Sequence, residues 1–135
     1  MTLEELEQSL PNGLHDAQID KITMDYLHSE LTLAVRVWVG LLSQPRPEKD
    51  RYRSSKIVFD KVHFFSIELP QAGSSFKFSG SVWFSYERMA PAVVPKELAG
   101  SIPSGTQCYS LFVQDWLSRI HVCAADVSFS WIDPV

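Results

Sequence analysis

The sequence predicts an all-β protein that begins with one short helix. From Glu30 to Gly40, apolar and polar residues alternate with a period of two, which is typical of a β-strand with one buried face. Similar alternation recurs further along the chain, between segments rich in proline, glycine and charge. These patterns predict about six main antiparallel strands, arranged either as a β-sandwich, which we favour slightly, or as a partly open β-barrel.

The composition is that of a folded protein. Of the 135 residues, 45% are hydrophobic and 21% are charged, whereas disordered chains combine low hydropathy with high charge. A chain of this length forms one ordinary domain, so we expect a single domain over residues 1–135 that needs no disulfide scaffold for its stability.

Charge and hydropathy argue against two classes of partner. The formal net charge is -4, and non-specific nucleic-acid binding depends instead on Lys and Arg that neutralise phosphates. The longest mainly apolar run, Leu31 to Leu42, contains Arg36 and is shorter than the about 20 residues of a membrane-spanning helix. Residues Met1 to Glu5 are acidic where a targeting segment would be basic. We therefore expect a cytoplasmic protein that binds neither nucleic acid nor membranes.

A short amphipathic helix is expected over residues 1–10, packed on the β domain. Thr2 and Glu5 have the spacing of a capping box, in which each side chain accepts a hydrogen bond from a backbone N–H at the helix start. Three leucines then recur at helical spacing, at Leu3, Leu6 and Leu10. The turn formers Pro11 to Gly13 end the helix.

The next two strands are expected to form a hairpin. The first runs from about Ala17 to Tyr26, and its apolar residues change parity, which predicts a bulge near Asp20 and Lys21. The segment 27–29 is short enough to connect this strand to the strand at 30–40.

Two long segments follow, each with a strand. Residues 43–53 hold two prolines and charges of both signs, so we interpret them as a solvated loop, although their basic residues could contact a phosphate or an acidic partner. Lys56 to Ile67 predicts one long strand, bent at Asp60 and Lys61. Phe76 to Tyr86 predicts another strand. Residues 89–106 then form mostly loop, with a single helical turn at Lys96 to Ala99.

The last two strands are predicted as a long hairpin. They span about Gln107 to Val113 and Ser118 to Trp131, with Gln114 to Leu117 as the loop. Beyond Ala124 the apolar residues change parity, which predicts a bulge near Ala124 to Asp126. A four-residue loop places Val113 opposite Ser118 and so fixes the register of the whole hairpin.

This register gathers four reactive side chains on one face. Cys108 lies opposite Cys123, and Ser110 lies opposite His121. Thiolate and imidazole are ligands that zinc prefers, so Cys108, Cys123 and His121 are candidate metal ligands. His121 could instead activate Cys108 or Ser110 as a nucleophile, which makes these three the candidate catalytic residues.

Two other interpretations of the same residues stay open. Buried free cysteines commonly behave as small apolar residues, and this purely structural role is the one we favour. A Cys108–Cys123 disulfide is also within reach of directly opposed strand residues, but the expected cytoplasmic location argues against it.

Two further features bear on a possible site, an adjacent histidine and aspartate and one tryptophan. His15 and Asp16 are adjacent, and neighbours on a strand point to opposite faces, so we do not expect them to act as a catalytic pair. Trp38 is out of phase with the buried residues of its own strand, which places it on the less buried face. It is a candidate interface residue, because an exposed tryptophan is costly unless the helix, a ligand or a partner covers it.

Three stretches resemble an uncharacterised family of small bacterial β-rich proteins. They are LPNGLHDA at 10–17, Val37 to Gly40, and Trp116 to Ala125, which includes Ile120-His121-Val122. The resemblance spans most of the chain and implies a bacterial source and a β-rich fold. It implies no activity and no catalytic residue.

The leading functional hypothesis is a non-enzymatic interaction or binding module without a cofactor. It could act as a homodimer or on another protein, for example as an immunity-protein-like inhibitor. The alternative is a small-ligand or metal-dependent enzyme that uses His121 with Cys108, Cys123 or Ser110. A third hypothesis is a barrel that encloses an apolar ligand, which requires a cavity among the interior side chains.

Overall fold

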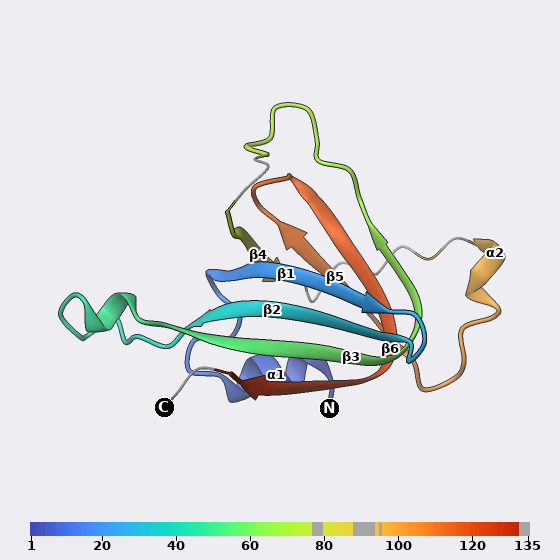
Figure 1. Ribbon diagram of the computed structural model, residues 1–135, viewed down its shortest axis with the longest axis horizontal. Coiled ribbons are helices and arrows are strands. Elements are labelled where there is room, and N and C mark those ends of the chain that lie inside the picture. Colours follow the sequence, from blue (N-terminus) through green and yellow to red (C-terminus); the bar gives the residue numbers. More distant parts are fainter. Residues whose placement is uncertain (77–79, 88–93, 95, 133–135) are drawn as a thin grey trace.

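The computed structural model is mostly β, as predicted (Figure 1). It describes residues 1–76, 80–87, 94 and 96–132. Within them the elements are α1 (Leu3–Ser9), β1 (Ala17–Asp25), β2 (Glu30–Trp38), the 3-10 turn η1 (Glu48–Asp50), β3 (Tyr52–Ile67), β4 (Val82–Tyr86), α2 (Lys96–Ala99), β5 (Gln107–Val113) and β6 (Ser118–Trp131). Neither α-helix is long and apolar enough to cross a membrane.

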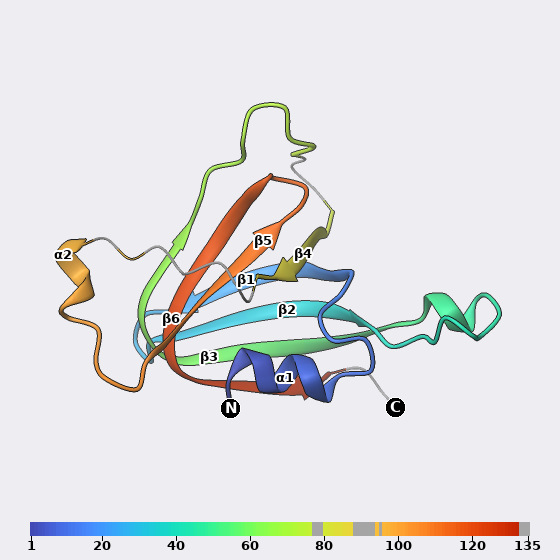
Figure 2. The ribbon, with the colours of Figure 1, turned by 180° about the vertical axis from the view of Figure 1, so that it is seen from behind.

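The six strands form a closed antiparallel ring. Their order is β1-β2-β3-β6-β5-β4, and β4 pairs back onto β1. The two longest strands, β3 and β6, pair along most of their length and curve together (Figure 2). Through this curvature they contribute to two differently oriented faces, as strands of a sandwich do, while the hydrogen-bonded ladder closes as in a barrel.

The bends of β3 and β6 coincide. Lys61 of β3 has a positive φ of 52°, and Asp60 pairs with Asp126 beside it. Two consecutive residues are exposed in each strand at this point, so the buried positions change parity in both strands together. This confirms the prediction of one long, bent strand for β3.

The position of one predicted bulge is wrong. The parity change near Ala124 to Asp126 exists, but the register shift between the two strands lies in β3, between Val62 and Phe64. Because β3 and β6 change parity at paired positions, β6 needs no extra residue there. The bulge predicted in the first strand is confirmed by the register shift between Ile19 and Lys21.

Two further predictions fall at the edge of the described residues. The strand predicted from Phe76 begins at Val82 in the structure, and residues 77–79 of that prediction lie outside the described residues. The predicted helical turn at Lys96–Ala99 is confirmed as α2. Residues 89–93 and 95 of the predicted loop at 89–106 are outside the described part of the chain.

One contiguous core fills the ring. Large side chains from all six strands occupy it with almost no exposure, among them Leu33, Ile57, Phe59, Phe84, Leu111 and Ile120. Helix α1 adds Leu3 and Leu6 to this core, and the Thr2 hydroxyl caps the helix by accepting from the Glu5 N–H. Interior packing of this kind disfavours the hypothesis of an enclosed apolar ligand.

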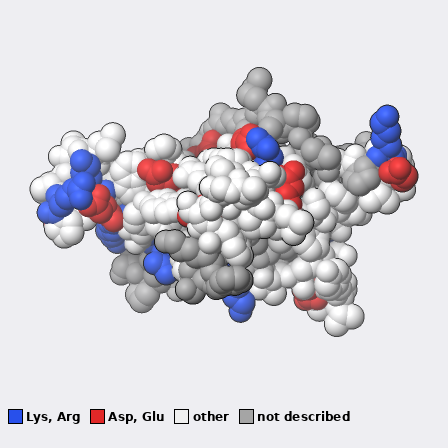
Figure 3. All heavy atoms as spheres, turned by 90° about the horizontal axis from the view of Figure 1, so that it is seen from above, with Lys and Arg blue, Asp and Glu red and all other residues white. Residues whose placement is uncertain are grey.

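A long connection between β2 and β3 projects from the ring, and we call residues 39–51 the arm (Figure 1). Its base is fixed by hydrogen bonds from the Trp38 indole N–H to the Lys49 carbonyl at 2.7 Å and from the Asn12 side-chain amide to the Gly40 carbonyl at 2.7 Å. Acidic and basic side chains lie next to each other on the arm (Figure 3), and Arg46 pairs with Asp50 at 3.2 Å. These contacts agree with the predicted solvated loop.

A side chain at Gly40, at the base of the arm, is expected to destabilise the protein. A Cβ atom there would lie 2.0 Å from the Lys49 carbonyl oxygen, closer than any tolerated contact. We expect Gly40→Ala to lower the free energy of unfolding by about 1–3 kcal/mol, as overpacked sites do, and to alter Trp38 fluorescence. Gly100→Ala is the matched control because a Cβ atom at Gly100 has no neighbour within 4 Å. Equal stability of the two variants in urea denaturation would contradict this close contact.

Candidate functional site

The hairpin of β5 and β6 has the predicted register. Cys108 pairs with Cys123 and Ser110 pairs with His121. The intervening residues of both strands, including Tyr109 and Val122, point into the core. The four reactive side chains therefore share the outward face of the hairpin, as the sequence indicated.

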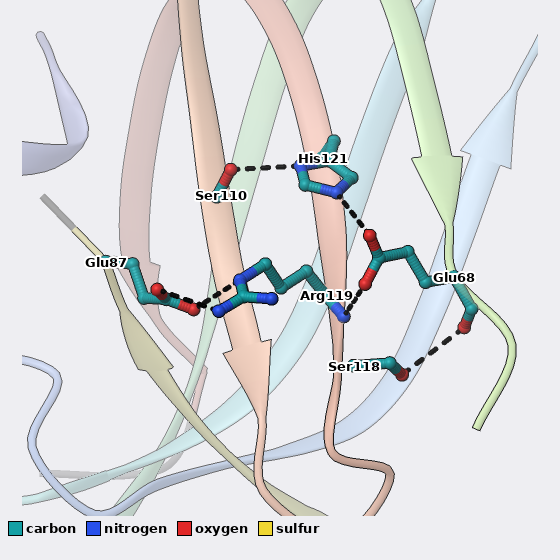
Figure 4. Close-up of polar contacts among 6 residues, drawn as sticks. All are labelled: Glu68, Glu87, Ser110, Ser118, Arg119 and His121. Atoms are coloured by element: carbon teal, nitrogen blue, oxygen red, sulfur yellow. Dashed lines mark hydrogen bonds and ion pairs between the residues drawn. The ribbon is translucent and has the colours of Figure 1, made fainter. Parts of the chain in front are cut away.

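Ser110 and His121 belong to a chain of three hydrogen-bonded side chains (Figure 4). The Ser110 hydroxyl oxygen lies 2.9 Å from His121 Nδ1, and His121 Nε2 lies 3.1 Å from a carboxylate oxygen of Glu68. Ser110 has no exposed surface and His121 is 2% exposed. Both imidazole nitrogens are thus occupied within the protein.

Glu68 is held in place by the backbone of β6. It follows β3 directly, and its own N–H donates to the Arg119 carbonyl at 3.0 Å. The Arg119 N–H donates to the second carboxylate oxygen of Glu68 at 2.8 Å. The hydrogen bond with His121 is the main cause that lowers the pKa of Glu68, and the Arg119 N–H adds to it. The carboxylate is therefore kept ionised beside the imidazole.

A second ion pair borders this chain of side chains. The Arg119 guanidinium binds the Glu87 carboxylate at 2.8 Å (Figure 4). It also lies 5.4 Å from the centre of the Phe112 ring. Because Glu87 follows β4 directly, the pair links the ends of β4 and β6 across β5. It covers part of the outward face on which Ser110 lies.

The Ser110, His121 and Glu68 side chains resemble the parts of a hydrolytic triad, but their placement differs from one. In the serine hydrolase arrangement, the nucleophile contacts His Nε2 and the carboxylate contacts Nδ1, whereas the contacts of His121 are the reverse. Ser110 lies within a paired strand and is fully buried, so a substrate carbonyl has no access to its hydroxyl. The geometry instead satisfies polar groups that the fold buries.

The structure contradicts the hypotheses of a zinc site and of a cysteine nucleophile, and it also contradicts the favoured interpretation of Cys108 and Cys123 as free cysteines. Cys108 and Cys123 are joined in a disulfide, with their Cα atoms 4.0 Å apart, so neither sulfur is a free thiolate. Among the described residues, no group of three or more His, Cys, Asp or Glu side chains could hold a metal ion. The direct pairing of the two residues in neighbouring strands brings the sulfurs together. Such bonds are more typical of oxidising compartments than of the expected cytoplasm.

Trp38 lies in a set of rings that we call the aromatic surface, formed by His15, Trp38, Tyr52 and Trp83. Trp38 pairs with Tyr52 across β2 and β3, and the His15 ring lies 6.1 Å from that of Trp38. The ring of Tyr52 meets Trp83 of β4 edge-on at 6.3 Å. Trp38 and Tyr52 are half-buried, while Trp83 is 36% exposed. Residues from four segments thus meet on the outer face of the ring.

Charged groups lie beside the aromatic surface. Arg36 of β2 is exposed and pairs with Asp20 at 3.0 Å. Burial raises the pKa of the Tyr52 hydroxyl, and the nearby carboxylates of Asp16 and Asp50 raise it further. The hydroxyl of Tyr52 is therefore a neutral donor at any physiological pH.

A pocket adjoins the aromatic surface at His15. Its volume is ≈ 260 Å³, and it is lined by Glu7, Asn12, Leu14, His15, Ser85 and Tyr86. Burial is the main cause that raises the pKa of Tyr86 to about 12, with a contribution from Glu4, whose carboxylate accepts a hydrogen bond from Tyr86 at 3.4 Å. The aromatic surface thus continues into a recess with polar walls.

The prediction for His15 and Asp16 is wrong in its geometry. They precede β1 in a turn, where Asp16 has a positive φ of 55°, so their side chains do not point to opposite faces. His15 Nε2 lies 3.4 Å from the Asp16 carboxylate. Both side chains are exposed, so the contact resembles an ordinary surface ion pair more than a catalytic dyad.

Glu68 is the site residue that the sequence did not reveal. It is 53 positions from His121, and no local pattern marks it as a partner. The position directly after a strand was the only available signal.

Comparison with known proteins gives no match to a family model, a curated protein or a solved structure. The resemblance to a bacterial family remains a prediction.

The Glu68 carboxylate is expected to make stability depend on pH. Its pKa is lowered in the folded protein, so its stabilising effect is complete above its unfolded value near 4.5 and is lost as pH falls through the lower folded value. We expect Glu68→Gln to destabilise the protein by about 1 kcal/mol at pH 7, a typical loss for one hydrogen bond. The difference from the wild type should shrink below pH 4.5.

Urea denaturation between pH 3 and pH 7 measures this difference in the free energy of unfolding. We expect it to be about 1 kcal/mol or less at each pH. Glu97→Gln in α2 is the matched control, because no hydrogen bond or ion pair involves Glu97 within the described residues. A Glu68→Gln effect of the same size at both ends of this range would show that the carboxylate charge is not involved.

Proposed function

We propose that this protein is a binding module whose contact area is the aromatic surface. The observation that carries the proposal is the contrast between two faces of the ring. The candidate catalytic residues Ser110 and His121 are buried, and both cysteine sulfurs are bonded to each other. Trp83, in contrast, remains exposed in contact with Tyr52 on the outer face of the ring.

The aromatic surface is held rigid before any partner arrives. Backbone pairing fixes Trp38 beside Tyr52, and the Trp38 indole N–H is bonded to the Lys49 carbonyl. The backbone N–H of Trp83 donates to the Asp115 carboxylate at 2.7 Å. Rigid tryptophan and tyrosine side chains lose little conformational entropy on binding, and they are enriched among residues that dominate interfaces.

The partner that we propose first is a second copy of the chain. The aromatic surface has the composition of a small interface core, and the exposed Arg36–Asp20 pair supplies both charges at its margin. A two-fold contact places the same surface of each copy face to face, so a margin that carries both charges can complement itself.

Removal of one exposed ring is expected to weaken this association. We expect the dissociation constant of a Trp83→Ser dimer to rise at least about tenfold, because central aromatic side chains contribute more than about 1.4 kcal/mol in typical interfaces. Sedimentation velocity over a range of protein concentrations measures it. Tyr26→Ser is the matched control, because Tyr26 is 78% exposed and is not part of the aromatic surface. A wild type that is monomeric at every concentration would contradict the proposed second copy.

The enzyme hypothesis is favoured by one observation, the hydrogen-bonded chain of Ser110, His121 and Glu68. If Ser110 were a nucleophile, a fluorophosphonate probe would label it, and Ser110→Ala would abolish that labelling. Because Ser110 has no exposed surface, we expect no labelling of the native protein. Intact-mass measurement detects the adduct. A Ser110 adduct that forms without denaturant would support a hydrolase in place of the binding module.

A further inference from the structure

We propose that the Cys108–Cys123 disulfide is a site of thiol–disulfide exchange, at which a small-molecule thiol attacks the sulfur of Cys108. The two halves of this disulfide differ in access. Cys108 is exposed, whereas Cys123 has no exposed surface. Exchange requires a thiolate to reach one sulfur directly, so the difference in exposure selects Cys108 as the point of attack.

The position of Cys108 in the fold favours access. It is the second residue of β5, and the segment that precedes the strand, residues 103–105, is exposed, as is Gln107. Cys123, in contrast, lies in the middle of β6 and pairs with β3 through Phe64 as well as with β5 through Cys108. A thiolate can therefore approach from the side of Cys108 but not from the side of Cys123.

The chemistry is balanced with a thiol as the only co-reactant. A thiolate forms a bond to Cys108 Sγ, the Cys108–Cys123 bond breaks, and Cys123 leaves as a thiolate that takes a proton from water. A second thiolate then attacks the thiol-derived sulfur of the mixed disulfide, which releases Cys108. The products are the protein dithiol and the oxidised small-molecule disulfide, so two electrons pass to the protein.

The surrounding ladder makes this exchange reversible without unfolding. β5 and β6 pair over seven residue positions from Gln107 to Val113, and the register extends well beyond the two cysteines. The two cysteines are only 15 positions apart in the sequence, and the hairpin already closes the loop between them. Because the ladder holds the Cα atoms of the two cysteines together, the dithiol is positioned to close again when an oxidised disulfide is present.

The test uses the intact protein and reduced glutathione as the small thiol. We expect peptide mapping after brief exposure and acid quenching to find glutathione on Cys108, followed by formation of the protein dithiol with an unchanged far-ultraviolet spectrum. Two results would overturn the proposal. One is glutathione attached only to Cys123, and the other is a disulfide that is reduced only when denaturant unfolds the chain.

Two single variants test whether the difference in exposure selects Cys108. In Cys123→Ser, the remaining thiol at Cys108 should react with glutathione disulfide at least ten times faster than the thiol of Cys123 in Cys108→Ser. In concentrated urea the two rates should become similar, which shows that burial, and not an intrinsic difference between the thiols, causes the native contrast. Similar rates in the native state would overturn the proposal. Tyr26→Ser, a substitution at an exposed tyrosine outside the aromatic surface, should exchange like the wild type.

Discussion

The coincident bend of β3 and β6 is the constraint on which the rest of the structure depends. Because both strands turn where Asp60 pairs with Asp126, their long ladder serves two faces and the ring can close. One end of β3 brings Tyr52 beside Trp38 at the aromatic surface. The other end places Glu68 next to His121. Both regions are thus positioned by the same strand, which has to be continuous and bent to reach them.

Local sequence patterns predicted the elements and the register of the last hairpin, because both depend on residues that are near one another in the chain. A four-residue loop after Val113 is sufficient to place Ser110 opposite His121. Contacts between distant segments could not be predicted in this way. The pairs Glu68–His121 and Tyr52–Trp83 depend on how β3 curves in space, and no spacing in the sequence encodes that path.

The misplaced bulge has the same origin. A change of apolar parity in a single strand has two physical solutions, which are an inserted residue or a bend that turns the strand over. At Lys61 the backbone adopts a positive φ, and β6 turns with it, so parity changes in both strands without a shift at that point. The extra residue appears two positions later, between Val62 and Phe64, where only the partner strand reveals it. The sequence of one strand alone therefore does not distinguish an inserted residue from a bend.

The β5–β6 turn connects the hairpin that carries the disulfide with the aromatic surface. Asp115 in this turn accepts from the Trp83 N–H at 2.7 Å, and the Gln114 N–H donates to the Trp83 carbonyl at 3.0 Å. The hairpin that carries the disulfide therefore also fixes the backbone of Trp83, the more exposed of the two tryptophans in the aromatic surface. Since strand pairing holds the hairpin independently of the disulfide, sulfur chemistry at Cys108 can proceed while Trp83 keeps its place. This arrangement lets the proposed exchange site and the proposed binding surface share one hairpin.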